Sequence, residues 1–178
     1  MISIIVPCFN EQHIIGDFVA EINKVIHKID SEFEIIIIDN NSTDDTWNCI
    51  KSANNKFSKF KFIKLSNYFG KEAAILAGLD HATGDAAIIM DPDLEDPPEL
   101  IEKMIENWKN GSDVVLTQRT SEKISITKKI LKIFFYKILI LSANSNEKIY
   151  SDSGDFRLID KKILIELKKM RERTRFLR

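Results

Sequence analysis

The sequence is poor in the residues that build disulfide frameworks, cysteine–histidine metal sites and Ser-His-Asp active sites. Among 178 residues it has two cysteines, Cys8 and Cys49, and three histidines. The cysteines lie far apart without metal-type spacing, so we expect reduced thiols in a cytosolic protein. The histidines, His13, His27 and His81, are scattered over segments with helical patterns, and we expect them at the surface or the core edge.

A secretion signal, an internal repeat and a low-complexity tract are also lacking. Met1 leads directly into ISIIVP without a basic segment, and this apolar run is too short for a signal peptide. A hydrophobic content of 44% and a charged content of 30% are ordinary for a soluble globular protein. We therefore expect one compact domain, 1–178.

The formal net charge of −1 hides an asymmetry along the chain. Residues 1–118 contain 10 Lys+Arg and 20 Asp+Glu, whereas residues 119–178 contain 16 and 7. The basic part suggests an anionic partner, either phosphate groups or a membrane surface. A solvated, lysine-rich helical surface is the alternative interpretation.

Five short apolar runs rich in Ile and Val predict strands that are covered on both faces. These runs are Ile2–Pro7, Phe33–Asp39, Phe60–Leu65, Ala86–Asp91 and Asp113–Arg119. Between them, helices are indicated by an apolar stripe from Ile14 to Ile29, by a cap at Asp44 or Thr43, and by the segment Lys71–His81. The alternation predicts an α/β fold with a mostly parallel sheet and helices on both faces.

In parallel sheets, ligands bind beyond the carboxyl ends of the strands. Polar residues follow all five predicted strands at this edge: Asn10 and Glu11, Asp39 to Ser42, Asn67 to Lys71, Asp91 and Asp93, and Arg119. The sequence therefore predicts a binding site there.

The stretch Ile88–Leu100 places five acidic residues and three prolines behind an apolar run. Asp91 and Asp93 are two residues apart at a strand end, where alternate side chains point the same way. Two adjacent carboxylates require a cation or a shared proton, and oxygen ligands favour Mg²⁺ or Mn²⁺. We assign Asp96 and Glu99 to the start of the next helix. An acidic capping turn and a two-carboxylate hydrolase are the alternatives.

Several motifs together resemble those of the family 2 glycosyltransferases. They are PCFNE (7–11), IIDNNSTDDT (37–46), SNYFGKEAAILAGLDHATGD (66–85), MDPDLEDPPELI (90–101) and SGDFRLID (153–160). Within the family, the sequence is most similar to enzymes that make polyisoprenyl-phosphate sugars. The resemblance covers nearly the whole chain and implies the A-type glycosyltransferase fold, which is Rossmann-like.

The resemblance implies a nucleotide-sugar part, 1–118, and an acceptor and membrane-proximal part, 119–178. The residues implied to bind the nucleotide sugar are Pro7, Asn10, Glu11, Asp39, Asn41, Ser42, Gly70, Lys71, Asp91 and Arg119. Asp91 and Asp93 match the D-x-D motif and would hold Mg²⁺ or Mn²⁺. The implied catalytic residues are Asp93, Asp155 and Arg157.

Asp155 falls where the family carries its catalytic carboxylate. A prenyl phosphate, however, is already largely ionised near neutral pH, with a second pKa of about 6 by analogy with phosphorylated side chains. We therefore expect Asp155 to orient the acceptor or its ion. It would act as a base only toward a sugar hydroxyl.

The implied activity is inverting transfer of a hexose from a UDP-glucose-like or GDP-mannose-like donor to a polyisoprenyl phosphate. The enzyme would work at the cytosolic membrane face, with no nucleic acid partner and an oligomeric state that the sequence does not indicate. A saccharide acceptor and an inactive, truncated nucleotide-binding domain are the alternatives. Glu95 stands where the branch usually has Gln, which puts the details of the donor in question.

The end of the chain, 172–178, resembles the stretch that precedes an amphipathic segment and transmembrane helices in the branch. We expect either a truncated catalytic domain or a membrane contact made by the segment Ser125–Ser142. Four lysines lie within that apolar segment, and each costs about 3 kcal/mol near a bilayer centre, so it is not expected to span. It fits an interfacial helix on anionic lipid, with packing on the domain's own core as the alternative.

The lysines at 128, 129, 132 and 137 give a testable prediction. If they bind anionic lipid, sedimentation of the protein with anionic vesicles should decrease as salt is added, because salt screens surface charge. Neutral vesicles are the control. Sedimentation that is absent or independent of salt would favour packing on the core.

Overall fold

The computed structural model describes residues 1–54, 60–118 and 153–169. The chain divides by its contacts into Met1–Thr117 with Asp155–Arg178 and a second unit, Gln118–Gly154. The description below concerns the first unit. Arg119, the segment Ser125–Ser142 and residues 172–178 lie outside the described residues, and the division at residue 118 into two functional parts stays a prediction.

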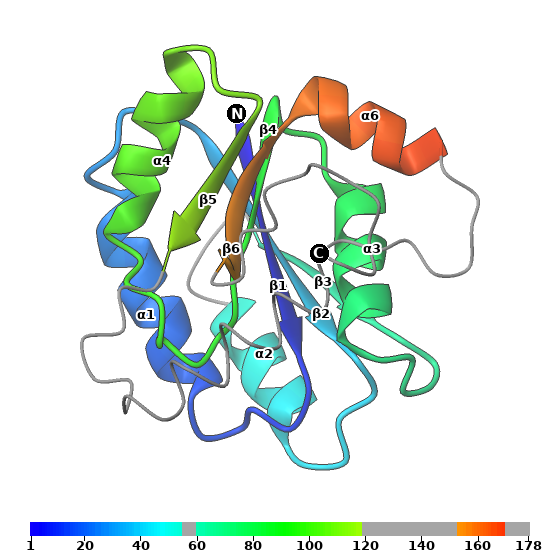
Figure 1. The fold of residues 1–178 in the computed structure, drawn as a ribbon. Helices are drawn as coiled ribbons and strands as arrows, with labels where there is room; N and C mark the ends of the chain where they lie inside the picture. Colours follow the sequence, from blue (N-terminus) through cyan, green and yellow to red (C-terminus); the bar gives the residue numbers. More distant parts are fainter. Residues whose placement is uncertain (55–59, 119–152, 170–178) are drawn as a thin grey trace, which may run out of the picture. The chain divides into compact units, whose positions relative to one another are not determined.

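Strands and helices alternate along the chain, and the strands form one sheet in the order β3-β2-β1-β4-β6-β5 (Figure 1). The strands are β1 (Ile2–Cys8), β2 (Phe33–Asp39), β3 (Phe60–Lys64), β4 (Ala86–Ile89), β5 (Val114–Gln118) and β6 (Ser153–Asp160). The helices are α1 (Ile15–Ile26), α2 (Thr46–Asn54), α3 (Lys71–His81), α4 (Leu100–Lys109) and α6 (Lys161–Lys169). None of these helices is long and apolar enough to cross a membrane.

The sheet is mostly parallel, as the sequence predicts. β1 pairs in parallel with β2 and with β4, and β2 pairs in parallel with β3. β6 pairs antiparallel with β4 and separates it from β5. The carboxyl ends of β1, β2, β3 and β4 therefore meet at one edge of the sheet, and the polar residues that follow them come together there.

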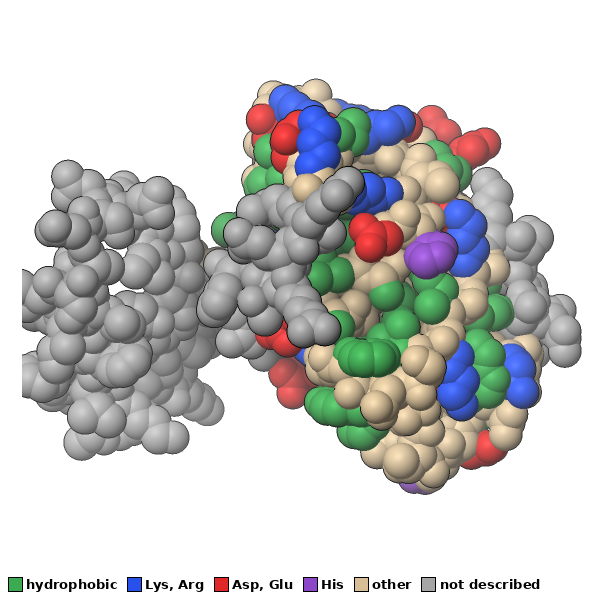
Figure 2. Space-filling view, turned by 90° about the vertical axis from the view of Figure 1, so that its right-hand side faces the viewer, with side chains coloured by type: hydrophobic (Ala, Val, Ile, Leu, Met, Phe, Trp, Pro, Cys, Tyr) green, Lys and Arg blue, Asp and Glu red, His purple; other side chains and the backbone are tan. Residues whose placement is uncertain are grey.

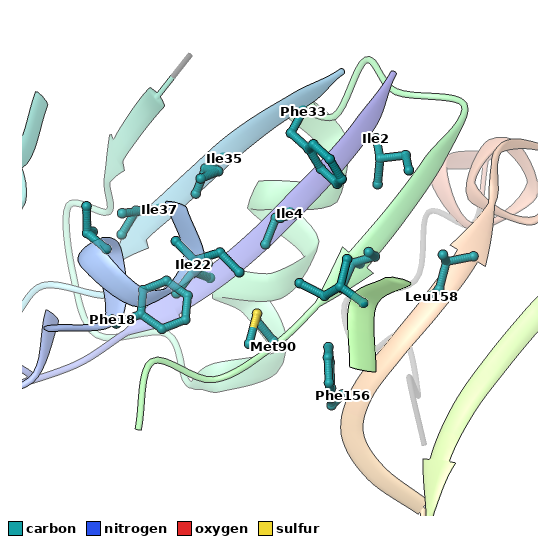
Figure 3. Packing of buried hydrophobic residues seen from close by; sticks show 14 of the residues in the cluster. Ile2, Ile4, Phe18, Ile22, Phe33, Ile35, Ile37, Met90, Phe156 and Leu158 are labelled. Atoms are coloured by element: carbon teal, nitrogen blue, oxygen red, sulfur yellow. The ribbon is translucent and has the colours of Figure 1, made fainter. Parts of the chain in front are cut away.

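Helices cover both faces of the sheet, because successive strand residues point to opposite sides. One core cluster joins Ile2 and Ile4 of β1 to residues of α1, α2 and α4, and Figure 3 shows Phe18, Met90 and Phe156 converging in it. The other cluster lies between the sheet and α3 and α6. The predicted two-sided architecture is thus confirmed.

Helix α3 lies close to the sheet at Gly78. A Cβ at this position would overlap the side chains of Ile5 and Ile38. At the start of α2, the Asp44 carboxylate accepts a hydrogen bond from the backbone N–H of Thr46 at 3.0 Å. Of the two predicted caps, Asp44 is therefore the one that the structure supports.

The expected burial of β3 and β5 on both faces is wrong. The sequence analysis also does not predict the antiparallel strand β6, which carries the SGDFRLID motif. β3 is only partly buried, and β5 exposes alternate residues, so neither is covered on both faces. Val114 and Leu116 of β5 are each 44% exposed. Short apolar runs do not distinguish an edge strand from a central one, and both β3 and β5 lie at sheet edges.

The lysines of α6 pair within the domain. Figure 2 looks onto the side of the molecule that carries α3 and α6, and Lys and Arg side chains gather along its upper edge. Lys161 pairs with Asp85 at 3.1 Å, Lys162 pairs with Asp113, and Lys168 donates to two backbone carbonyls. These contacts within the domain do not test the predicted anionic partner of 119–178, which stays a prediction.

A buried carboxylate, Glu34, ties strands together at the end of the sheet opposite to the polar edge. Its side chain is 7% exposed, and it pairs with Lys61 of β3 at 2.6 Å. It also accepts hydrogen bonds from the hydroxyl of Ser3 on β1 and from the backbone N–H and hydroxyl of Thr83. Although burial opposes the charged form, these partners lower the pKa of Glu34 to about 2.

The low pKa of Glu34 predicts a pH-dependent contribution to stability. Because the pKa is lower in the folded chain than in the unfolded chain, the contribution is complete above about pH 5 and is lost as the pH falls toward 2. Glu34→Gln should lower the free energy of unfolding by about 2 kcal/mol at pH 7 and flatten its decline in acid. Urea denaturation at several pH values measures both effects.

Glu21→Gln is the matched control, because Glu21 pairs with Lys24 on the solvent side of α1. It should change the stability by less than about 0.5 kcal/mol. An acid profile of Glu34→Gln that matches the wild type would contradict the role assigned to the buried carboxylate.

Candidate functional site

An open pocket of about 200 Å³ lies at the polar edge of the sheet. It is formed where β1 ends, where α3 begins and where the chain leaves β4. Its lining residues are Pro7, Cys8, Phe9, Glu11, Asn40, Tyr68, Lys71, Ala74, Asp91, Pro92 and Asp93. The pocket therefore contains five of the predicted site residues.

Lys71 connects two of the predicted carboxylates. Its Nζ lies 2.6 Å from an oxygen of Asp91 and 2.6 Å from an oxygen of Asp155. On the other side of Asp155, a guanidinium nitrogen of Arg157 lies 3.7 Å from the second carboxylate oxygen. Residues from α3, the segment after β4 and strand β6 thus converge, and Asp155 and Arg157 join the site although they do not line the pocket.

Lys71 is the first residue of α3, and Gly70 sets the direction in which the helix starts. Gly70 has φ 88°, a conformation in the region that favours glycine. The turn places Lys71 at the end of the helix that faces the pocket. A side chain with a Cβ at position 70 would strain this turn, although nothing lies in the space that the Cβ would occupy.

Asp91 and Asp93 line the same pocket for a reason that differs from the predicted one. β4 ends at Ile89, so the two carboxylates stand on a turn and not on alternate positions of a strand. Within the turn, Asp93 accepts a hydrogen bond from the backbone N–H of Glu95 at 3.0 Å, and Leu94 has φ 58°. A leucine in this region is strained, and such strain often accompanies functional turns.

The loops after β1 and β2 are joined by hydrogen bonds between their side chains and backbones. The Asn10 side-chain oxygen accepts from the backbone N–H of Thr43 at 2.8 Å, and the Asn10 N–H donates to the hydroxyl of Ser42 at 2.9 Å. Asn10 and Asn41 have φ 58° and 62°, which asparagine tolerates better than most residues. Asn10, Asn41 and Ser42 therefore shape the loops beside the pocket and do not line it.

Asp39, the last residue of β2, is fully buried. One carboxylate oxygen accepts a hydrogen bond from the backbone N–H of Ser42 at 3.0 Å. The other oxygen has no hydrogen-bond partner within the described residues, and the ammonium of Lys64 lies 3.7 Å from it. Lys64 in turn lies over the ring of Trp47, 5.5 Å from the ring centroid. A buried acceptor of this kind has a lone pair that an N–H donor could use.

The pocket is crowded with negative charge. Burial raises the pKa of Glu11, and the charges of Asp93 and Asp91 add to this rise. Burial also raises the pKa of Asp91, although Lys71 opposes it. Burial lowers the pKa of Lys71, but hydrogen bonds to Asp155 and Asp91 outweigh burial and raise it overall. The site therefore favours a cation, or a ligand that brings one.

Sequence reasoning missed several residues of the pocket. Phe9 and Tyr68 come from different loops, and their ring centroids lie 4.6 Å apart. Both are exposed at the pocket, and Phe69 beside them is 58% exposed. The missed residues are Cys8, Phe9, Ala74 and Pro92, whereas Asn40 and Tyr68 lie in the polar stretches predicted after β2 and β3. The pairing of the rings of Phe9 and Tyr68 has no signal in the sequence, because no spacing rule brings two rings together from separate loops.

Asp91 and Asp93 fit a divalent cation that is shared with a ligand. Among residues 1–54, 60–118 and 153–169, no group of three or more His, Cys, Asp or Glu side chains could hold a metal ion by itself. Mg²⁺ usually binds one or two carboxylates, keeps several waters and uses phosphate oxygens for the rest of its coordination shell. Two hard oxygen donors at the mouth of an open pocket match that pattern.

Solved glycosyltransferases share this fold. The chain is similar to the glucosyl-3-phosphoglycerate synthase of Mycobacterium tuberculosis, solved with Mn²⁺, UDP and product, with a TM-score of 0.65 and 19% identity over 94% of this chain and 59% of that one. It is also similar to a mannosyltransferase of Pyrobaculum calidifontis, solved with GDP-Man and Mn²⁺, with a TM-score of 0.62 and 19% identity over 93% and 46%. At this identity the similarity establishes the fold class alone.

The chain belongs to the family described as glycosyl transferase family 2, whose model matches residues 3–168. Among curated relatives, the prophage bactoprenol glucosyl transferase homolog of Escherichia coli is 37% identical over 99% of this chain and 58% of its own length. The uncharacterized glycosyltransferase YkcC of Bacillus subtilis is 36% identical over 99% and 54%. The chain therefore spans little more than half the length of these relatives.

The donor set predicts that Asp93 supports metal-dependent binding of a nucleoside diphosphate. Asp93→Asn should weaken the affinity for UDP or GDP in the presence of Mn²⁺ by about tenfold or more, because one of two carboxylate ligands is lost. In EDTA the variant and the wild type should bind equally. Isothermal titration calorimetry measures both affinities.

Glu99→Gln is the matched control for Asp93→Asn. It removes one carboxylate from the same acidic stretch at an exposed position that does not line the pocket. An unchanged nucleotide affinity of Asp93→Asn in Mn²⁺ would remove Asp93 from the metal site.

Proposed function

We propose that this chain is the catalytic part of an enzyme that transfers a hexosyl group from a nucleotide diphosphate sugar to a polyisoprenyl phosphate. The observation that carries the proposal is the convergence of Lys71, Asp91 and Asp155, with Asp93 on the same pocket. Similarity over nearly the whole chain to relatives named bactoprenol glucosyl transferases supports the choice of acceptor.

The donor binds across the carboxyl ends of β1, β2 and β4. The buried oxygen of Asp39 accepts an N–H from the nucleobase, which suits a uracil or a guanine. Asn41 and Ser42 lie beside the ribose, while Pro7, Asn10 and Glu11 form the loop that closes over the nucleotide. Gly70 permits close approach of the backbone to the diphosphate.

Asp91 and Asp93 would hold Mg²⁺ or Mn²⁺, with donor phosphate oxygens as the ligands that complete its coordination shell. When bound, the cation offsets the negative charge that develops on the leaving nucleoside diphosphate. Lys71 adds positive charge on the same side. A guanidinium forks onto two phosphate oxygens, which suits Arg119 and Arg157 to grip phosphate groups.

Transfer is a single displacement with inversion at the anomeric carbon. A phosphate oxygen of the acceptor forms the new bond to this carbon, while the bond to the β-phosphate oxygen breaks and its electron pair leaves with the nucleoside diphosphate. The acceptor is already ionised near neutral pH, so no proton has to be removed. Asp155 and Arg157 therefore act by orienting the acceptor phosphate and its counter-ion.

The enzyme works at the cytosolic face of a membrane, because its acceptor is a membrane lipid. The basic part of the chain, 119–178, lies toward the anionic lipid surface in this proposal. The segment Ser125–Ser142 is the proposed contact, because its lysines would attract anionic lipid.

The test of the proposed function is transfer of radiolabel to an organic-soluble product. The chain, or the full-length protein that contains it, is incubated with labelled UDP-glucose or GDP-mannose, Mn²⁺ and a short prenyl phosphate. Label that becomes extractable into organic solvent supports the proposal. Transfer only to glycans would assign a saccharide acceptor, and nucleotide binding without transfer would make the chain a binding domain.

The orienting role of Asp155 predicts a dependence on the acceptor. Asp155→Asn should reduce kcat far less with a prenyl phosphate than with a sugar-hydroxyl acceptor, where a general base contributes about 10²- to 10⁴-fold. Asp113→Asn, which also removes a lysine-paired carboxylate, is the control and should leave both rates unchanged. Equal losses with the two acceptors would contradict the distinction.

A further inference from the structure

The ammonium of Lys71 already occupies one oxygen of a carboxylate that the proposed function assigns to the metal. Its Nζ lies 2.6 Å from Oδ2 of Asp91 and 2.6 Å from Oδ2 of Asp155. The side chains of Lys71, Asp91 and Asp155 are 37%, 24% and 22% exposed, so the bridge is partly shielded from water. Charge-assisted hydrogen bonds of this length are the stronger kind.

The bridge spans three elements of the fold. Lys71 starts α3, Asp91 follows β4, and Asp155 lies near the start of β6. Without the ammonium, the carboxylates of Asp91 and Asp155 would lose the positive charge between them, while a guanidinium nitrogen of Arg157 lies farther away, 3.7 Å from Asp155. Like charges held together in this way repel, so the amine stabilises the arrangement.

We propose that Lys71 is a built-in counter-ion that holds Asp91 and Asp155 together in the metal-free site and competes with a divalent cation for Asp91. The inference rests on the proposed function in one respect, the assignment of Asp91 and Asp93 to the cation. It goes further by giving Lys71 a role before any ligand arrives. The positive end of α3 adds to the ammonium charge and strengthens this competition.

Competition makes the apparent affinity for the cation depend on Lys71. The cation binds only the fraction of molecules in which the ammonium has left Asp91, so the observed Kd equals the intrinsic Kd divided by that fraction. By the same linkage, a bound cation shifts Lys71 toward Asp155. Binding of the metal ion at Asp91 is in this way coupled to the ion pair between Lys71 and Asp155, the carboxylate that the proposed function places at the acceptor.

The experiment measures Mn²⁺ binding to the protein alone, without nucleotide or acceptor, by electron paramagnetic resonance of the free ion. Lys71→Met removes the charge and keeps the length of the side chain, and it should bind Mn²⁺ about tenfold more tightly than the wild type. Lys71→Arg keeps the charge and should remain within about twofold of the wild type. Asp91→Asn should lose the tight site in either background.

Lys61→Met is the matched control. Lys61 also pairs with a carboxylate at 2.6 Å, but it does so at the opposite end of the sheet. It should lower the melting temperature and leave the Mn²⁺ affinity unchanged. If Lys71→Met does not fold, Lys71→Gln, which removes the charge and keeps a hydrogen-bond donor, carries the same expectation of tighter binding.

Mn²⁺ affinity that is unchanged or weaker in the charge-removing variants would overturn the competition. So would tight binding that survives Asp91→Asn, because the cation would then sit elsewhere. The first result leaves the proposed function untouched, whereas the second also removes Asp91 from the metal site assigned there. The organic-extraction assay tests the transfer reaction by itself. Loss of transfer with tighter Mn²⁺ binding in Lys71→Met would support both the competition and a further use of the lysine during the reaction.

Discussion

Parallel pairing of β1 with β2 on one side and β4 on the other is the constraint on which the rest of the structure depends. It places the carboxyl ends of these strands at one edge of the sheet. The polar residues that directly follow the strands therefore lie within a short loop of the same pocket. Both faces of the sheet must then be covered, which the two core clusters accomplish with α1, α2 and α4 on one side and α3 and α6 on the other. The strands that carry the site, β1, β2 and β4, are fully buried, and this packing holds the site in place.

Charge is the second constraint, because more carboxylates than positively charged groups lie at this edge of the sheet among the described residues. Among the described positive groups, Lys71 lies close to Asp91 and Asp155, Arg157 lies near Asp155, and Lys64 lies near Asp39. A nucleotide diphosphate would add still more negative charge, which the metal ion proposed at Asp91 and Asp93 would offset. The ion pairs of the protein are in this way connected to the proposed chemistry, since the ammonium of Lys71 and the proposed metal ion compete to neutralise Asp91.

Much of the fold was predictable from the sequence, because the central strands and the helices have clear periods. β2 begins and ends where the apolar run predicts, and the polar residues after β1 and β4 do line one pocket. The sequence analysis does not predict β6, although Asp155 to Leu158 alternate charged and apolar residues as a half-buried strand does. Its antiparallel pairing with β4 has no signal in the local sequence. The contact of Lys71 with Asp155 spans 84 residues and depends on that strand, so no local pattern contained it.

The antiparallel strand β6 also restricts how the site can vary. Phe156 and Leu158 point into the core beside α1 and α4, while Ile159 belongs to the opposite cluster, so the strand alternates between the two faces. A deletion of one residue within β6 would turn the side chain of Asp155 to the face of the sheet that Phe156 now occupies. The charge of Asp155 would then be buried in the core. Changes of specificity at this position therefore have to come from substitution of side chains at fixed length, whereas the loops after β1 and β2 can change in length as well.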